Sequence, residues 1–457
     1  MKTASDIKLN LADIQGNILK AYRHPYAAYL FFQFPGATEG KKWLRHLLDV
    51  GVTSSEIWPE DFATGHRKKP SATLNCALTF AGLETLGVNG QRLALLPLAF
   101  KAGMYVRAGQ LGDAREHWEP QLHDGAIHAM VMVYAESESA RQSRVEALQQ
   151  AAKTLGLSEV AGVIRADALA EQSEHFGFRD GIGQPSIEGG LVDEPGMGVP
   201  ENDGRWRPLK PGEFLLGYTS EREAAPLPPS LLDLCLNGTY VVFRKLAQDV
   251  AAFRAFVRDA ALSAFGSDGQ VEQDQVAAKL VGRWRSGAPL VLSPSHDSGS
   301  AENNFRYRDD PEGLRCPLGA HIRRTNPRDA LSDGTHVPFH RILRRGLPYG
   351  PPFETAPDAD RGLVFLALNA DIEAQFEFIQ EQWVNKGEFA GLLTEERDPI
   401  IGANLDGQIT VPGATHNPFV FGLNRFVSTR GGGYFLMPGI TTLKRLADGT
   451  LQGDLHG

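Results

Sequence analysis

The order of apolar strands and helices along the chain constrains its fold more than any other feature. The first set consists of strands at Ala27–Phe34, Ala72–Phe80, Ala126–Tyr134 and Val160–Ala166, with helices at Lys41–Val50, Ala81–Leu86 and Ser139–Leu155. The first strand is rich in aromatic residues, and Trp43, Leu44, Leu47 and Leu48 recur at helical spacing in Lys41–Val50. This order predicts an α+β unit in which helices cover one face of a sheet.

A second set of similar order follows. Its strands are expected at Glu213–Tyr218, Gly238–Lys245 and Gly362–Asn369, its helices at Asp249–Phe265 and Ile372–Trp383, and its loops at Val192–Leu227 and Ser286–Gly319. A chain of 457 residues exceeds one ordinary core. We therefore expect an internal duplication with domains at residues 1–191 and 192–457, although the sequence has no clear repeat.

Charge and cysteine content exclude several classes of function. The chain has 46 Lys and Arg against 55 Asp and Glu, a net charge of −9, which argues against nucleic acid or an anionic membrane as a partner. Its three widely spaced cysteines argue against a zinc site and a disulfide framework. The polar first ten residues and the absence of a membrane-length apolar run predict a cytoplasmic protein.

The glycine-rich stretch Glu174–Glu188 is the first candidate site. It places Asp180 between Arg179 and Gly181, in a segment where several glycines permit tight backbone turns. Loops that also carry charged and aromatic side chains often bind ligands. From the residues alone, a solvated turn is an equally good interpretation.

Two further segments carry chemistry-bearing residues. Cys316–Arg328 contains one histidine, His321, followed by arginines; imidazole can bind iron, and guanidinium groups can bind carboxylates. A hydrogen-bonded structural histidine and a solvated basic face are the alternatives. In His340–Pro352, alternation places Arg344 and Arg345 on opposite faces of an extended segment, so one points inward and the other faces solvent. An inward arginine requires an anion or a reacting oxygen.

These segments together resemble the dye-decolorizing peroxidases, a family of haem peroxidases. The resemblance covers nearly the whole chain and rests on four segments in the family's order: Asp13–Leu19, Gly177–Gly181, Gly319–Arg324 and Ile342–Gly346. Asp398–Gly402 resembles a segment of the longer members. The resemblance implies a duplicated ferredoxin-like α+β fold, with antiparallel sheets flanked by helices and one haem b held mainly by the second half.

The resemblance also implies roles for single residues. His321 is expected to be the proximal iron ligand, Asp180, beside Gly181, to lie on the distal face of the haem, and Arg344, rather than Arg345, to be its distal partner. The other expected site residues are Arg323 and Arg324 for the propionates, Leu363 and Phe365 for the peroxide pocket, Asp398 for hydrogen bonding to the proximal histidine, and Trp383 and Tyr349 as electron relays. Gly346 stands where some members have Asn. Trp383 is equally well interpreted as a packing residue.

The expected activity is reduction of hydrogen peroxide and one-electron oxidation of dyes, phenols or bulkier aromatic reductants through a ferryl intermediate. Asp180 would move a proton between the peroxide oxygens and Arg344 would stabilise the developing charge, with an acidic pH preference. The alternatives are a haem-handling protein of the deferrochelatase kind, with incidental peroxidase activity, and a haem-free structural protein. Retention of both Asp180 and Arg344 favours the enzyme. A monomer and a homo-oligomer both remain open.

Overall fold

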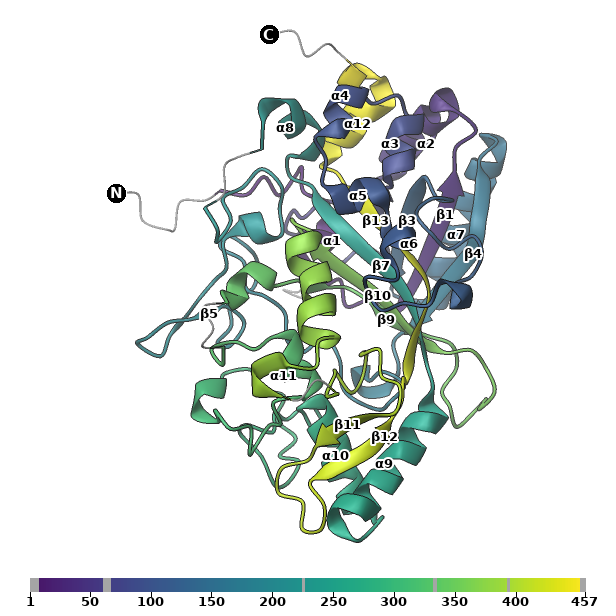
Figure 1. Ribbon diagram of the computed structural model, residues 1–457. Helices are drawn as coiled ribbons and strands as arrows, with labels where there is room; N and C mark the ends of the chain where they lie inside the picture. Colours follow the sequence, from purple (N-terminus) through teal and green to yellow (C-terminus); the bar gives the residue numbers. More distant parts are fainter. Residues whose placement is uncertain (1–7, 61–66, 224–226, 332–334, 393–394, 453–457) are drawn as a thin grey trace.

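A single nine-stranded antiparallel sheet runs through the protein (Figure 1). The computed structural model describes residues 8–60, 67–223, 227–331, 335–392 and 395–452. The strands follow the order β4-β1-β3-β2-β13-β7-β10-β8, with β9 also paired to β10. Strands from both halves of the chain therefore share one sheet, and the C-terminal strand β13 lies in its middle.

The first half has the chain order and strand order of a ferredoxin-like unit. Its elements are β1 (Tyr26–Gln33), α2 (Ala37–Val50), β2 (Ala72–Leu78), α3 (Phe80–Thr85), α4 (Gly90–Ala94), α5 (Leu98–Ala102), α6 (Met104–Arg107), β3 (Ala129–Ala135), α7 (Glu138–Thr154) and β4 (Ser158–Asp167). Helix α2 buries Trp43, Leu44 and Leu47 at helical spacing, and it ends at Gly51, whose left-handed conformation suits glycine.

The second half repeats this arrangement. Its elements are β7 (Thr239–Gln248), α9 (Val250–Phe265), α10 (Gln270–Val281), β8 (Leu343–Arg344), β9 (Leu347–Tyr349), β10 (Gly362–Asn369), two π-helical turns (Glu373–Glu377 and Ile379–Val384) and β13 (Val427–Met437). The order β13-β7-β10-β8 corresponds strand for strand to β4-β1-β3-β2. The duplicated ferredoxin-like fold is confirmed, whereas the boundary at residue 191 stays a prediction.

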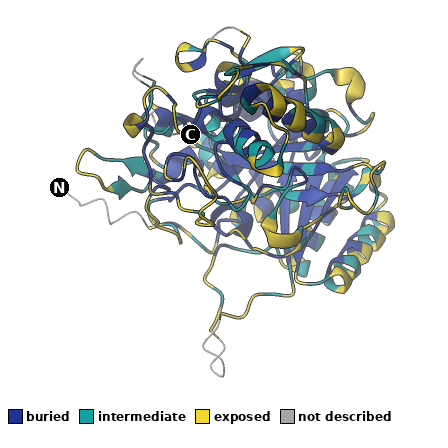
Figure 2. Ribbon diagram, turned by 90° about the horizontal axis from the view of Figure 1, so that it is seen from below, coloured by how far each residue is buried: buried dark blue, intermediate teal, exposed yellow. Residues whose placement is uncertain are grey.

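The inner faces of the two halves pack against each other. Alternate residues of β1, including Tyr29 and Phe31, meet Phe243 of β7, with ring centroids 5.7 and 5.1 Å apart. The intervening residues of β1 face the core under α2 and α7. In Figure 2 the strands are buried, while the helices expose their outer sides. Period-two alternation thus divides each strand between a shared inner core and a helix-covered outer core.

The seam between the halves is narrow. β2 and β13 share one register pair, Leu78 opposite Leu436. The buried side chain of Gln15, just before α1 (Gly16–Leu19), reinforces the seam. Its amide donates to the carbonyls of Cys76 and Pro438, both at 2.9 Å, and its Oε1 accepts the Cys76 N–H at 3.0 Å. The opening motif is therefore a clamp across the two halves.

Several sequence-based expectations were wrong or incomplete. Glu213–Tyr218 is not a strand: a 3-10 turn at Pro211–Glu213 opens it, because Pro211 and the positive φ of Gly217 favour turns. Helix α10, strand β13 and helix α12 (Ile440–Asp448) were not anticipated, nor was the hairpin of β11 (Gly407–Thr410) and β12 (Phe419–Leu423).

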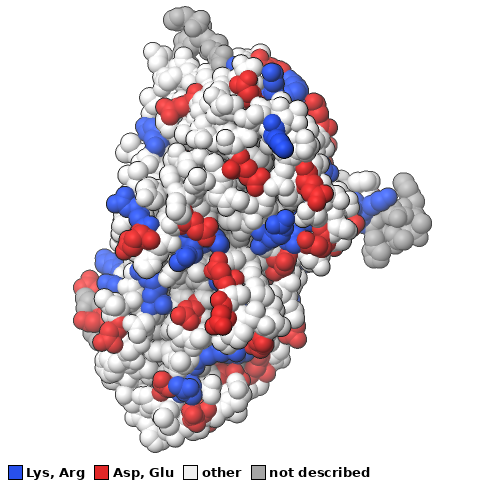
Figure 3. Space-filling model, turned by 90° about the vertical axis from the view of Figure 1, so that its right-hand side faces the viewer, with Lys and Arg blue, Asp and Glu red and all other residues white. Residues whose placement is uncertain are grey.

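The surface carries charges of both signs (Figure 3), and the three cysteines form no disulfide. The face in Figure 3 intersperses positive and negative side chains rather than gathering one sign. All three cysteines are buried and unpaired. Of the helices in the described ranges, none has the length and apolar character needed to cross a membrane.

Candidate active site

One large cavity is lined by five of the predicted site residues, Asp180, His321, Arg344, Leu363 and Phe365. It lies against the outer face of β7 and β10, where Leu363 and Phe365 point away from the inner core. Short helix α11 (His321–Thr325), the end of α10 and the glycine-rich loop contribute further lining residues. Both Leu363 and Phe365, as predicted, line this cavity. Most of the lining comes from the second half of the chain.

Asp180 and Arg344 face each other across this cavity. Arg344 Nη1 donates to Asp180 Oδ1 at 2.8 Å, and each side chain keeps about a third of its surface open (33% and 34%). Burial raises the pKa of Asp180, but Arg344, the N–H of Gly181 and the more distant His321 together outweigh it and hold that pKa below its ordinary value. Asp180 is therefore an ionised base in contact with a permanent cation.

The backbone around Asp180 explains the glycine pattern of its loop. Gly177 and Gly181 have φ of +92° and +75°, a region that side chains other than glycine rarely adopt. The half-buried carboxylate of Glu174 accepts the N–H groups of Phe176 and Phe178, both at 2.9 Å. Gly181 lies next to the cavity as a backbone support for Asp180 rather than as part of the lining.

His321 and Asp398 form the second pair. His321 lines the cavity, and its Nδ1 lies 2.9 Å from Oδ2 of Asp398. Asp398 has no exposed surface. Asp398 also accepts the N–H groups of Ile400 and Ile401, at 2.8 and 2.9 Å. Burial raises the pKa of Asp398, but His321 and these N–H groups lower it below its ordinary value. The ionised Asp398 can only accept, so Nδ1 is the donor and Nε2 keeps its lone pair for a metal.

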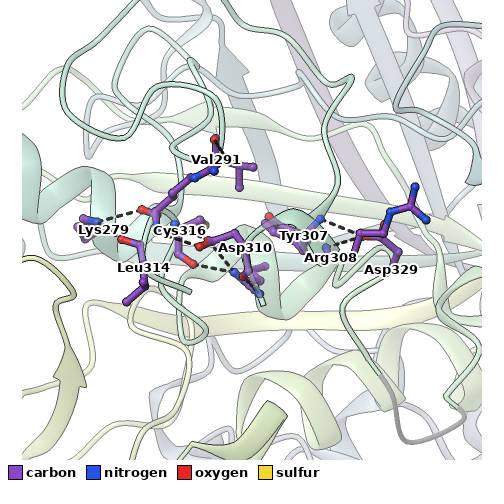
Figure 4. A network of polar contacts seen from close by, with 10 residues as sticks. Lys279, Val291, Tyr307, Arg308, Asp310, Leu314, Cys316 and Asp329 are labelled. Carbon is purple, nitrogen blue, oxygen red and sulfur yellow. Dashed lines mark hydrogen bonds and ion pairs between the residues drawn. The ribbon is translucent and has the colours of Figure 1, made fainter. Parts of the chain in front are cut away.

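Arg323 and Arg324 do not reach the cavity, which corrects the propionate role predicted for them. Arg323 pairs with Asp310 at 3.1 Å and donates to the Cys316 carbonyl at 2.8 Å, in the buried network around Asp310 shown in Figure 4. Arg324 donates to backbone carbonyls, including that of Trp383 at 2.5 Å. Both guanidinium groups hold together the loops behind α11.

Among the other arginines that line the cavity, Arg328 belongs to the basic segment after His321, whereas Arg341 was not anticipated. Burial lowers the pKa of Arg341 to about 10, and its guanidinium has no hydrogen-bond or ion-pair partner within the described ranges. Burial likewise lowers the pKa of Arg328 to about 9, and Arg328 is stacked on Phe305 at 3.8 Å. Arg328 Nη1 donates to the carbonyls of Asn303 and Phe305, at 2.8 and 2.9 Å, whereas the half-buried guanidinium of Arg341 needs an anion in the cavity to balance its charge. Alternation gave no signal for Arg341, because residues three apart lie on opposite faces of an extended segment.

The cavity therefore fits haem. Apolar side chains from α10, α11, β10 and the Ile400–Ile401 turn supply walls for a flat macrocycle, and His321 offers a free ring nitrogen. Arg341 and Arg328 would hold the propionates. A Cβ on Gly346 would lie 2.0 Å from the Val364 carbonyl, so the backbone there excludes the Asn of some family members.

The two residues predicted as electron relays lie outside this lining. Trp383 is 3% exposed and contacts the rings of His340 and Phe378. Tyr349 is 6% exposed, and its hydroxyl donates to Asp360 at 3.2 Å. Both rings are packed, so neither offers a broad contact surface to a large molecule, and the relay role stays a prediction.

A duplicated ferredoxin-like fold with a histidine–aspartate pair and an aspartate–arginine pair on one cavity defines a haem peroxidase of the α+β class. Two family models match the chain: "DyP dimeric alpha+beta barrel domain" at residues 13–166 and "Dyp-type peroxidase, C-terminal" at residues 232–403. The chain belongs to the dye-decolorizing peroxidase family.

Individual relatives agree with this assignment. Peroxidase 2 of Mycetinis scorodonius is 31% identical, with 96% of this chain and 88% of that protein covered. The multifunctional dye peroxidase DyP2 of an Amycolatopsis species is 32% identical, with 95% and 96% covered. The solved structure of a dye-decolorizing peroxidase in complex with 2,6-dimethoxyphenol superposes with a TM-score of 0.80 at 29% identity, covering 96% of this chain and all of that one.

Proposed function

We propose that the protein binds haem b in this cavity and uses it to reduce hydrogen peroxide while oxidising aromatic dyes or phenols. The peroxidase class follows from family membership. The observation that supports this cavity as its site is the convergence of Asp180, Arg344 and His321 on one space. When bound, haem supplies the iron that cleaves peroxide and accepts electrons from a reductant one at a time.

Asp180 and Arg344 divide the acid–base and electrostatic work. The ionised Asp180 carboxylate takes a proton from one oxygen of hydrogen peroxide and delivers it to the other oxygen, which then leaves as water. Arg344, permanently charged and 2.8 Å from Asp180, stabilises negative charge that develops on the peroxide oxygens. Because the pKa of Asp180 is depressed, the base form persists into acidic solution.

His321 and Asp398 act on the other side of the chemistry. Asp398 fixes the tautomer and the ring orientation of His321 through the Nδ1 hydrogen bond. The buried negative charge makes the imidazole a stronger electron donor, which favours the oxidised iron. Asp398 is in turn held by two backbone N–H groups, so the histidine rests on a rigid base.

The class of reductant is inferred from the relatives. One solved relative is a complex with 2,6-dimethoxyphenol, and others carry dye oxidation in their names. We propose phenols and dyes as reductants here, with Trp383 or Tyr349 passing electrons from reductants too large for the cavity. Trp383 lies three residues after Gln380, which lines the cavity on the same π-helical segment, so Trp383 offers the shorter covalent path.

A haem-handling function is the weaker alternative. Deferrochelatases of Yersinia species match 97 residues at 34% identity, which covers 21% of this chain and 20% of those proteins. A haem carrier needs the iron ligand and the propionate contacts. Such a carrier does not need a base and a cation 2.8 Å apart in the cavity that His321 lines.

The test is an absorption spectrum of the haem-reconstituted protein beside His321→Ala and Asp180→Asn. We expect a Soret band that is lost or strongly altered only in His321→Ala, and peroxide-driven dye oxidation that is lost in Asp180→Asn. A wild-type protein that takes up no haem would overturn the proposal. Haem binding without peroxide turnover would favour the carrier.

A further inference from the structure

Arg344 stands on a strand of two residues at the edge of the sheet. β8 pairs only with β10, where Arg344 lies opposite Ala367 and the Arg345 N–H donates to the Leu366 carbonyl at 2.8 Å. In such an antiparallel ladder the N–H and carbonyl of Arg344 point away from β10. An edge strand leaves these groups without a ladder partner. So short a strand needs other bonds to fix the direction of its side chains.

Gln184 supplies the first of these bonds. Its Oε1 accepts the outward N–H of Arg344 at 3.0 Å and lies 3.5 Å from Arg345 Nη1. Gln184 follows Asp180 by four residues in the same glycine-rich loop. One loop therefore holds Arg344 at two points, the guanidinium through Asp180 and the main chain through Gln184.

Arg345 supplies the second bond. Its Nη1 donates to the outward carbonyl of Arg344 at 2.9 Å, while Nε and Nη2 donate to the carbonyls of Asn17 and Ile18, each at 2.9 Å. Those carbonyls belong to the four-residue helix α1, whose last carbonyls have no partner within the helix. Arg345 thus ties the Arg344 peptide to the opening motif of the chain instead of facing solvent.

The opening motif is itself a rigid anchor. The Asp13 carboxylate accepts the side-chain amide of Asn237 and the N–H of Thr441, both at 2.6 Å, and Gln15 spans the seam of the sheet. The Arg344 peptide is therefore fixed on one side by the loop that carries Asp180 and on the other by the clamp that joins the two halves.

We propose that Gln184 and Arg345 are positioning residues that hold the Arg344 main chain so that its guanidinium stays against Asp180. The inference rests on the proposed peroxidase function and extends it to two residues that do not touch peroxide. If the Arg344 guanidinium moves away from Asp180, the reaction with peroxide loses its aligned cation, and Asp180 loses the charge that helps to keep it ionised. Misplacement of this kind can cost about 100-fold in rate.

The main test is Gln184→Met, which keeps the length of the side chain and removes the acceptor. The haem-loaded variant is compared with wild type and with Gln408→Met, a half-buried glutamine on β11 outside the cavity lining. We expect the second-order rate constant with hydrogen peroxide to fall about 10- to 100-fold, its acidic limb to move to higher pH, and KM for the reductant to stay unchanged. Gln408→Met should match wild type.

Two further measurements keep the test decisive. Arg345→Lys retains the charge but loses the fork that reaches three carbonyls, so it should change the rate and the pH profile in the same direction, and it carries the test if Gln184→Met does not fold. Crystal structures of both variants should show Arg344 displaced from Asp180. Retention of the 2.8 Å pair together with wild-type kinetics would overturn the inference. If wild type itself does not react with peroxide, the proposed function fails, while the crystallographic comparison still tests the positioning.

Discussion

Arg344 and Asp180 are joined at 2.8 Å by side chains that each keep a third of their surface open to one cavity. Most ion pairs of this exposure contribute little to stability. This one instead sets a protonation state, because the cation offsets the cost of burying the carboxylate. The pair is thus a prepared base with its counter-charge already in place.

Removing the base should abolish the peroxide step while leaving haem in place. In Asp180→Asn we expect the rate constant with hydrogen peroxide to fall by about 10²- to 10⁴-fold, because an amide cannot carry the proton between the oxygens. Stopped-flow absorption at the Soret band measures this rate. Asp406→Asn, at an exposed aspartate, is the control and should behave as wild type.

Removing the cation should shift the pH dependence. The pKa of Asp180 lies below its ordinary value in the folded protein, so the base form is lost only as pH falls through that depressed pKa. In Arg344→Leu the pKa of Asp180 rises, because the largest of the interactions that offset its burial is lost. The acidic limb of the peroxide rate should therefore move to higher pH. An unchanged limb would show that Arg344 does not set the ionisation of Asp180.

Neutralising Asp398 should act through the reduction potential of the iron rather than through proton transfer between the peroxide oxygens. Asp398→Asn loses the buried charge that accepts the Nδ1 proton of His321. We expect a higher iron reduction potential, measured by spectroelectrochemistry, and about 10- to 100-fold weaker activity. A potential equal to that of wild type would rule out the electron-donating role.

Substituting an arginine of the cavity and an arginine of the buried Asp310 network should have different effects. Arg341→Gln should weaken haem retention, measured by transfer of haem to an acceptor protein, because the unpaired guanidinium in the cavity is lost. Arg323→Gln should instead lower the free energy of unfolding by about 3–5 kcal/mol, because Asp310 is left as a buried, unpaired charge. Chemical denaturation of both variants distinguishes the two effects.

The relay role of Trp383 predicts a split between reductants. Trp383→Phe keeps a ring against His340 and Phe378 and removes the easily oxidised indole. We expect slower oxidation of a bulky anthraquinone dye and an unchanged rate with 2,6-dimethoxyphenol. Tyr349→Phe tests the alternative relay in the same assay. If both variants oxidise the dye and the phenol at the wild-type rates, these rings serve packing alone.

The resemblance to the peroxidase family predicted the pairs Asp180–Arg344 and His321–Asp398, and both pairs are present. Alternation in His340–Pro352 separated Arg344 from Arg345, and the structure confirms Arg344 as the residue on the cavity. The sequence could not predict the partner of Arg345, because α1 lies more than 300 residues away in sequence. Its orientation away from solvent was therefore missed.

Other errors have equally specific causes. Arg323 and Arg324 follow His321 directly, but the side chains of so short a helix diverge, and Asp310 and the carbonyls near Trp383 capture both. Strand β13 was missed because Gly431–Gly433 interrupts its apolar pattern, and glycine is depleted in strands. The expected strand at Glu213–Tyr218 had the right composition, but Pro211 and Gly217 direct the backbone into turns.

The central position of β13 bears on how the protein is made. Its partner β7 is about 190 residues earlier in the chain, so the middle of the sheet can form only after all the residues between β7 and β13 have been synthesised. Contacts between segments so far apart in sequence form slowly. The nascent first half must therefore wait with the edge of β2 uncovered until β13 has been made. A chain that stopped before Val427 would deprive both halves of their shared strand.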